Sequence, residues 1–246
     1  MIWVHLQTIF SFRSYHLLAF ATRKHRALFA VYLFLLSLLV FYFFSGSFIH
    51  RNLPVFLKNF PQITFEKGVL TSPSKPVVIP IPQSPFQLVF EAGRKMPPTL
   101  NELTESQTLV WISGNTLYMP GANGLQAQPL PPTLNFTTTP EFLKKNQPVL
   151  AASLRFFSLI MGILFIPFIF LFDFCIAASV GLFFNLLRAR RVSRNRILTW
   201  AFFLLGPLSA LWFVRLWVTI PLFTLAQVFL CIIYMQQIFN TFPEEN

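Results

Sequence analysis

Long apolar runs dominate the chain and are separated by polar segments that carry most of its charge. The first run, residues 27–49, has no charged residue and is long enough for a helix that crosses the roughly 30 Å hydrocarbon core of a bilayer. A second run covers residues 148–187, and a third covers residues 197–239, which exceeds the length of one span. We divide the third run into two spans at a short turn around Arg215, so the pattern predicts four transmembrane helices.

Two of these spans have an alternative interpretation. Residues 27–49 could be a cleaved signal peptide, because Ser45 and Ser47 form a small-x-small pair after a basic flank, although the run is long for a signal. The third span, residues 197–214, is near the lower length limit, so a re-entrant hairpin with residues 217–239 is the alternative to two full spans.

Between the first two spans, residues 50–147 change to short alternating runs with many prolines and both signs of charge. A β-hairpin is predicted around Gly68, because glycine tolerates the positive φ of a tight turn. The Thr99-x-x-Glu102 spacing predicts the start of a short helix. Further strand-like runs cover residues 77–81, 86–90 and 109–119. We therefore predict a small β-rich domain inserted between spans 1 and 2, with residues 120–147 as an irregular tether.

Lysine and arginine residues cluster beside the spans and predict the orientation of the chain. One cluster precedes the first span and another lies between the second and third spans, so we place both segments on the cytoplasmic side. The residues that determine this topology are Arg23, Lys24, Arg26, Arg188, Arg190, Arg191, Arg194 and Arg196. Residues 1–26 then form a cytoplasmic interfacial segment, 188–196 a basic cytoplasmic loop and 240–246 a cytoplasmic tail. Both termini are inside, and the β-rich domain is extracytoplasmic.

The composition agrees with a membrane protein, because 54% of the 246 residues are hydrophobic and only 11% are charged. The net charge of +11 is then chiefly an orientation signal and an attraction to the lipid bilayer through its anionic headgroups. We expect no nucleic-acid partner, because the basic residues adjoin the spans and no recognition module surrounds them.

Recognisable catalytic chemistry is absent from the sequence. The four His and two Cys residues form no metal-binding spacing, and no Walker, nucleophile-elbow or dinucleotide motif occurs. We therefore expect no metal, no cofactor and no enzymatic activity.

Asp173 is the sharpest candidate for a functional residue, because a carboxylate inside a span costs about 2.5 to 3.5 kcal/mol and usually faces the bundle interior. It could bind a proton or a cation, or pair with Arg215 if the turn at that arginine dips inward. The alternative is a structural polar contact with Gln227, Gln236 or an interhelical hydroxyl. Two pairs of small residues also permit close helix packing, within the bundle or in a dimer. These pairs are Ala177 with Gly181 and Gly206 with Ala210.

The order of these segments resembles a bacterial family of multi-span membrane proteins of unknown function, one branch of which is labelled maltodextrin-utilization membrane protein. The resemblance is carried by an N-terminal FSFRSYHLL, a basic run and a span, then FPQITFEKGVLTS, FQLVFEAG and TLVWISGNTLYM, and finally three hydrophobic segments. This chain has Glu91-Ala92 where family members tend to have an Asp-Thr pair. The resemblance implies a multi-pass protein of the bacterial cytoplasmic (inner) membrane and brings no catalytic residues.

Two functions fit this organisation. We favour a non-enzymatic accessory or scaffold protein whose extracytoplasmic β-domain contacts a membrane or periplasmic protein partner, or a ligand, of a transport or envelope system. One acidic residue in four predicted spans is sparse for a translocation path. The alternative is a small transporter or channel subunit that uses Asp173. The sequence assigns no oligomeric state.

Overall fold

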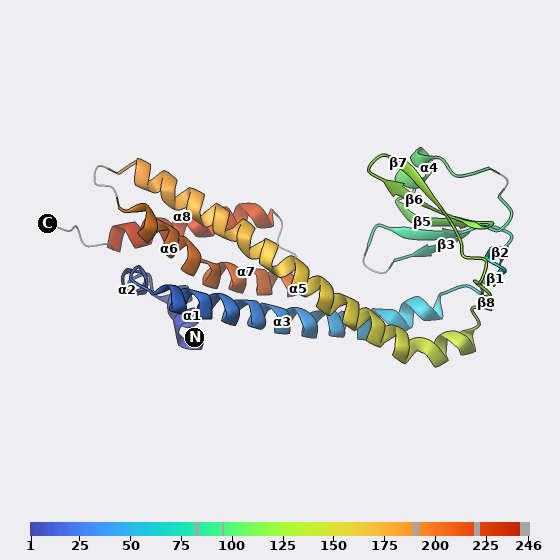
Figure 1. Cartoon of the computed structure of the whole chain (residues 1–246), viewed down its shortest axis with the longest axis horizontal. Helices are drawn as coiled ribbons and strands as arrows, with labels where there is room; N and C mark the ends of the chain where they lie inside the picture. The colour runs from blue at the N-terminus through green and yellow to red at the C-terminus, as the bar shows by residue number, and fades with distance from the viewer. Residues whose placement is uncertain (82–83, 95, 189–191, 219–221, 242–246) are drawn as a thin grey trace. The chain divides into compact units, whose positions relative to one another are not determined.

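Four helices of the computed structural model are long and apolar enough to cross a membrane, which confirms the coarse prediction from the sequence. The chain divides into a helical unit, residues 1–46 and 155–246, and a β unit, residues 47–154. Figure 1 traces the whole chain in order. The residues that the structure describes are 1–81, 84–94, 96–188, 192–218 and 222–241.

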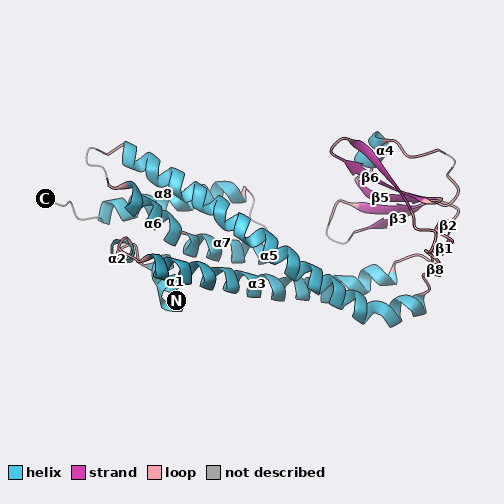
Figure 2. Ribbon diagram, in the orientation of Figure 1, coloured by secondary structure: helices cyan, strands magenta, loops and turns pink. Residues whose placement is uncertain are grey.

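The helical unit contains two short N-terminal helices and parts or all of the four long apolar segments (Figures 1 and 2). Its helices are α1 (Ile2–Phe10), α2 (Ser14–Leu18), the first part of α3 (Arg23–Lys58), the later part of α5 (Pro140–Leu186), α6 (Arg194–Phe203), α7 (Leu205–Trp217) and α8 (Phe223–Thr241). The short α1 packs against α7, and α2 packs against α6. The N-terminal segment is therefore folded onto the helical unit.

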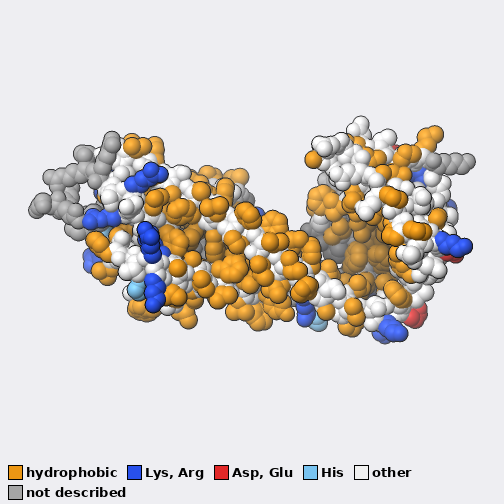
Figure 3. All heavy atoms as spheres, in the orientation of Figure 1, with side chains coloured by type: hydrophobic (Ala, Val, Ile, Leu, Met, Phe, Trp, Pro, Cys, Tyr) orange, Lys and Arg blue, Asp and Glu red, His pale blue; other side chains and the backbone are white. Residues whose placement is uncertain are grey.

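Aromatic side chains fill the core of the helical unit. Trp200 of α6 and Tyr15 of α2 have no exposed surface, and the Trp200 indole donates a hydrogen bond to the Tyr15 carbonyl oxygen at 3.0 Å. Phe29 of α3 packs on Phe203 with ring centroids 5.0 Å apart. In contrast, the outer surfaces of α3 and α5 are broadly hydrophobic (Figure 3). Apolar surface directed outward and aromatic packing directed inward are the distribution that suits helices in lipid.

The division of the third apolar run differs from the sequence prediction. Arg215 lies in the last turn of α7, which continues to Trp217, so the predicted turn at Arg215 is wrong. The connection to α8 comes later and includes residues 219–221, which lie outside the described residues. An arginine is compatible with a helix interior, and the guanidinium carbon of Arg215 lies 4.3 Å from the centroid of the Phe223 ring.

Two sheets make up the β unit (Figure 2). The smaller sheet has the order β2-β1-β8, and the larger has the order β3-β4-β5-β6-β7. β4 and β5 are parallel and are connected through the short helix α4 (Leu100–Glu105), whereas the other neighbouring strands are antiparallel. The strands are β1 (Thr64–Glu66), β2 (Val69–Ser72), β3 (Val77–Pro80), β4 (Gln87–Phe90), β5 (Thr108–Ser113), β6 (Thr116–Gly121), β7 (Gly124–Pro129) and β8 (Phe136–Thr137).

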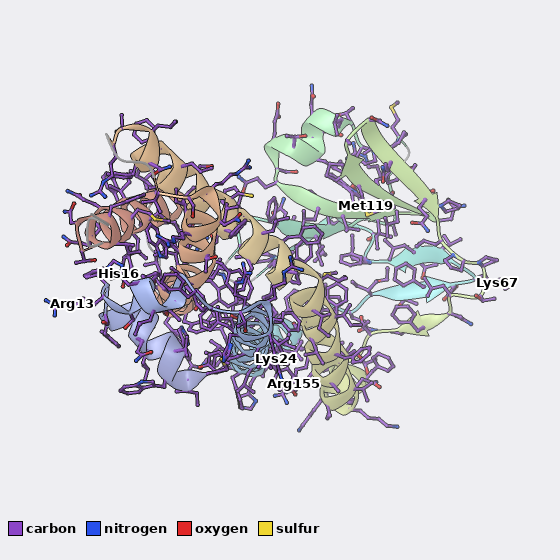
Figure 4. The ribbon with its side chains drawn as sticks, turned by 60° about the vertical axis from the view of Figure 1, so that its left-hand side comes forward. Arg13, His16, Lys24, Lys67, Met119 and Arg155 are labelled. Atoms are coloured by element: carbon purple, nitrogen blue, oxygen red, sulfur yellow. The ribbon has the colours of Figure 1, made fainter. Side chains whose placement is uncertain are left out.

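The hairpin predicted around Gly68 is present and joins β1 to β2. Lys67 and Gly68 both have positive φ, 50° and 78°, and Lys67 lies at the tip of the hairpin (Figure 4). A Cβ atom at Gly68 would lie 2.6 Å from the Pro131 carbonyl oxygen, so the position requires glycine for space as well as for its backbone angle. The predicted helix start is also present, because Thr99 and Glu102 form a capping box at α4.

Residues 120–147 are not an irregular tether. They contain β7, β8 and the first residues of α5, which begins at Pro140, before the apolar run itself. The strand β7 has the sequence GLQAQP, whose residues have low intrinsic β-propensity, and it is ordered through its pairing with β6. That pairing is a hairpin closed at Ala122-Asn123, and the Asn123-Gly124 dipeptide was a local turn signal that the prediction from the sequence did not use.

Candidate functional site

Asp173 lies on the inner side of α5 and contacts α8. Its side chain is 1% exposed, and the Gln227 amide Nε2 donates a hydrogen bond to Asp173 Oδ1 at 2.7 Å. Gln227 is itself only 3% exposed. The structure therefore places the carboxylate against one of the polar partners that the sequence suggested, and this contact joins two of the long helices.

A cavity of about 290 Å³ adjoins this pair. Aromatic side chains of α5, α7 and α8 form most of its wall, and the polar groups at the cavity are Asp173, Gln227 and Arg215. Arg215 is turned toward the Phe223 ring, and among the described residues no ion pair joins it to Asp173. The two opposite charges thus line one cavity without neutralising each other directly.

The polar side chains at this cavity offer groups that can contact small charged species. A carboxylate with one oxygen hydrogen-bonded to an amide can accept a proton or contact a cation, and a guanidinium can bind an anion. Among the described residues there is no group of three or more His, Cys, Asp or Glu side chains that could hold a metal ion. The chemistry available at the cavity is therefore proton or ion binding within aromatic walls.

The predicted small residues contact different neighbours. Ala177 is fully buried, and a Cβ atom at Gly181 would lie 2.8 Å from side-chain carbons of Ile197 on α6 and Met235 on α8. Gly206 faces α1, because the Thr8 side chain occupies the place where its Cβ atom would lie. Ala210 is half-buried. Ala177, Gly181 and Gly206 thus allow close approach between segments of the same chain.

Two arginines on either side of the connection between α5 and α6 contact neighbouring segments at one end of the helical unit. Arg188 donates a hydrogen bond at 2.8 Å to the carbonyl oxygen of Phe239, near the end of α8, and its guanidinium lies over the ring of that residue. Arg196, at the start of α6, lies over the Phe20 ring, which follows α2. Lys and Arg side chains gather at this end in Figure 3, and Figure 4 shows Arg13 and His16 close to each other. The other predicted topology residues are Arg23, Lys24 and Arg26 at the start of α3, Arg194 at the start of α6, and Arg190 and Arg191, which lie outside the described residues.

A buried polar cluster around His5 was missed by sequence reasoning. His5 is 6% exposed, and its two ring nitrogens lie 3.3 Å from the Tyr32 hydroxyl and 3.2 Å from the Gly206 carbonyl oxygen. The Ser209 hydroxyl lies 3.4 Å from His5 Nε2 and donates a hydrogen bond to the same carbonyl oxygen at 2.7 Å. Burial lowers the pKa of His5 below its usual 6.5, although the backbone contact opposes this shift. The one available signal was a histidine within an apolar segment, and nothing in the sequence connects it with residues two hundred positions away.

Comparison with known proteins gives one family. The family described as "Protein of unknown function (DUF1189)" matches residues 6–239 of the chain. No curated protein and no solved structure matches the chain significantly. The family match includes residues of both units, and its description assigns no activity to either.

Proposed function

The chain belongs to the DUF1189 family of proteins of unknown function, and from this premise we propose that it is a non-enzymatic accessory protein of a bacterial inner membrane. Its four apolar helices anchor it in the bilayer. Its β unit lies outside the cytoplasm, where it contacts a protein of a transport or envelope-assembly system. The termini lie in the cytoplasm.

The observation that carries this proposal is the β unit itself. Its sheets enclose a hydrophobic core, in which Ile63 is 1% exposed and Leu70 is 2% exposed. Large apolar side chains nevertheless remain on its surface, among them Phe86 and Met96, which are 42% and 77% exposed. These exposed apolar positions are where we expect a protein partner to contact the β unit.

The proposed orientation is supported by the position of the basic residues. Arg188, after α5, contacts the end of α8, and Arg196, at the start of α6, contacts the segment after α2. The basic clusters that precede α3 and α6 therefore lie at one end of the helical unit. Lysine and arginine are retained on the cytoplasmic side of inner-membrane proteins. An even number of spans then returns the C-terminus to the side of the N-terminus.

Photocrosslinking in the membrane tests the accessory function. We would place a photoreactive phenylalanine analogue at Phe86 or Met96 and, as the matched control, at Phe65, which is 4% exposed. We expect a discrete crosslinked partner from the two exposed positions and none from the buried one. The proposal fails if neither exposed position yields a partner other than the protein itself.

A second candidate function, a small transporter or channel subunit, is favoured by the charged cavity at Asp173. Asp173→Asn keeps the size of the side chain and its ability to contact Gln227, but it removes the charge. A proton-coupled carrier should lose proton flux in this variant, measured with a pH-sensitive dye inside proteoliposomes. An accessory protein should show no such flux in either form and should keep its crosslinks from Phe86 and Met96.

A further inference from the structure

β7 lies at an edge of the five-stranded sheet, beside β6 alone (Figure 1). In an antiparallel pair, the backbone groups of successive residues point alternately toward the partner strand and away from it. The amide of Leu130 donates to the Asn115 carbonyl oxygen, so Gln128, Gln126 and Gly124 direct their backbone groups toward β6. The backbone groups of Leu125, Ala127 and Pro129 therefore point outward, away from the sheet.

The two edges of this sheet differ in their protection against further pairing. Edge strands are usually blocked by charged residues or prolines. At β3, Pro80 and the preceding Pro76 both fall at outward positions, because the amide of Ile81 donates to Phe86 and fixes the alternation there. β7 has one outward proline, Pro129 at its end, and no Asp, Glu, Lys or Arg occurs between Ser106 and Pro140.

The outward groups of β7 are complementary to those of a second β7. If two copies are antiparallel and centred on Ala127, each Ala127 amide meets the Ala127 carbonyl oxygen of the other copy. Each Leu125 amide then meets a Pro129 carbonyl oxygen. Pro129 has no amide hydrogen, so no outward donor in this stretch is left without a partner.

We propose that two copies of this chain associate through antiparallel pairing of their β7 strands around a two-fold axis at Ala127. Two donors from each copy give four intermolecular hydrogen bonds, and the two five-stranded sheets become one continuous sheet. Cross-strand neighbours are then Leu125 with Pro129 on one face and Gln126 with Gln128 on the other. The absence of charge leaves no like-charge repulsion across the axis.

Membrane anchoring makes such a small interface effective. A single strand pair buries less surface than the roughly 1,200 Å² of a stable soluble complex. Two chains held in one bilayer meet at a much higher effective concentration than free molecules, so a weak contact suffices. The two-fold axis of this pairing is normal to the sheet. Two chains inserted in the same direction can be related only by an axis along the bilayer normal. The pairing therefore requires that the sheets lie parallel to the bilayer surface.

A charge swap at the axis tests the proposal in the full-length protein. Ala127→Lys and Ala127→Glu each place like-charged side chains on Cα atoms about 5.5 Å apart across the axis, and co-expression of the two variants places opposite charges there. We would count copies of the tagged protein by single-molecule photobleaching in membrane patches. We expect dimers for the unmodified protein, at least about tenfold less association for each variant alone, and recovery when both are expressed together.

Proline substitution provides a second and independent readout. Ala127→Pro removes an outward amide and leaves the pairing of β7 with β6 intact, while Val78→Pro does the same on the other edge strand. Ala127→Pro should abolish dimers and Val78→Pro should leave them. The proposal is overturned if the unmodified protein is monomeric, if Ala127→Pro stays dimeric, or if Ala127→Cys crosslinks to a different protein instead of to its own copy.

Discussion

At the scale of single residues, His5 links α1 to α3 and α7 in its uncharged form. The Gly206 carbonyl oxygen can only accept a hydrogen bond, so His5 Nε2 carries the proton, and Nδ1 is left to accept from the Tyr32 hydroxyl. Because burial lowers the pKa of His5, the unfolded chain binds a proton more readily than the folded chain below pH 6.5. The contribution of uncharged His5 to the free energy of unfolding is therefore complete above about pH 6.5 and is lost as the pH falls.

We predict that thermal unfolding of the detergent-solubilised protein occurs at a lower temperature at pH 5.5 than at pH 7.5, and that His5→Gln reduces this difference. The substitution should also cost about 1 to 3 kcal/mol at pH 7.5, because the hydrogen bonds of His5 are disturbed in a buried place. His16→Gln must be measured separately, because burial also lowers the pKa of His16. His25→Gln, at an exposed position, is the matched control, and an equal loss of pH dependence there would refute the assignment to His5.

At the scale of elements, the β1–β2 and β5–β6 hairpin turns of the β unit make different demands on glycine. Gly68 has a φ of 78° and faces the Pro131 backbone, whereas Gly114 has a φ of 55° with no atom within 4 Å of its potential Cβ. Gly114→Ala should lower the free energy of unfolding by about 1 to 2 kcal/mol, because alanine is strained at this positive φ. Gly68→Ala should cost about 2 kcal/mol more, because the Pro131 backbone must move. Hydrogen exchange of the β1 and β2 amides would show the difference, and equal protection in the two variants would contradict it.

The same elements show what sequence could and could not predict. The turn at Gly68 and the capping box at Thr99 were predicted because each is a local signal within a few residues. β7 was missed because several of its own residues have low β-propensity and the Asn123-Gly124 turn that pairs it with β6 was not used. The turn at Arg215 was misplaced because an arginine is compatible with a helix interior. At the cavity, Asp173 and Arg215 were found from the rarity of charge in apolar runs, but the aromatic wall depends on how the helices pack and rotate.

At the scale of the whole molecule, the proposed function depends on which side of the membrane each segment occupies. The basic residues gather at one end of the helical unit, where α2, the start of α6 and the end of α8 meet. Neutralising part of this charge should weaken the orientation signal, because lysine and arginine near the spans determine insertion. In the β unit, Lys144 and Lys145 are the basic pair next to the second apolar run, and the unit's Lys and Arg residues are offset by five Glu residues.

We predict that cysteine labelling from outside intact cells distinguishes the β unit from the basic end of the helical unit. In a chain with Cys175 and Cys231 replaced by Ala, Met96→Cys lies on the β unit at a position that is 77% exposed, and Arg13→Cys lies beside α2. A maleimide that cannot cross the inner membrane should label Met96→Cys in whole cells, and Arg13→Cys only after the membrane is permeabilised. Labelling of Arg13→Cys without permeabilisation would reverse the proposed orientation, and the β unit would then have to find its partner in the cytoplasm.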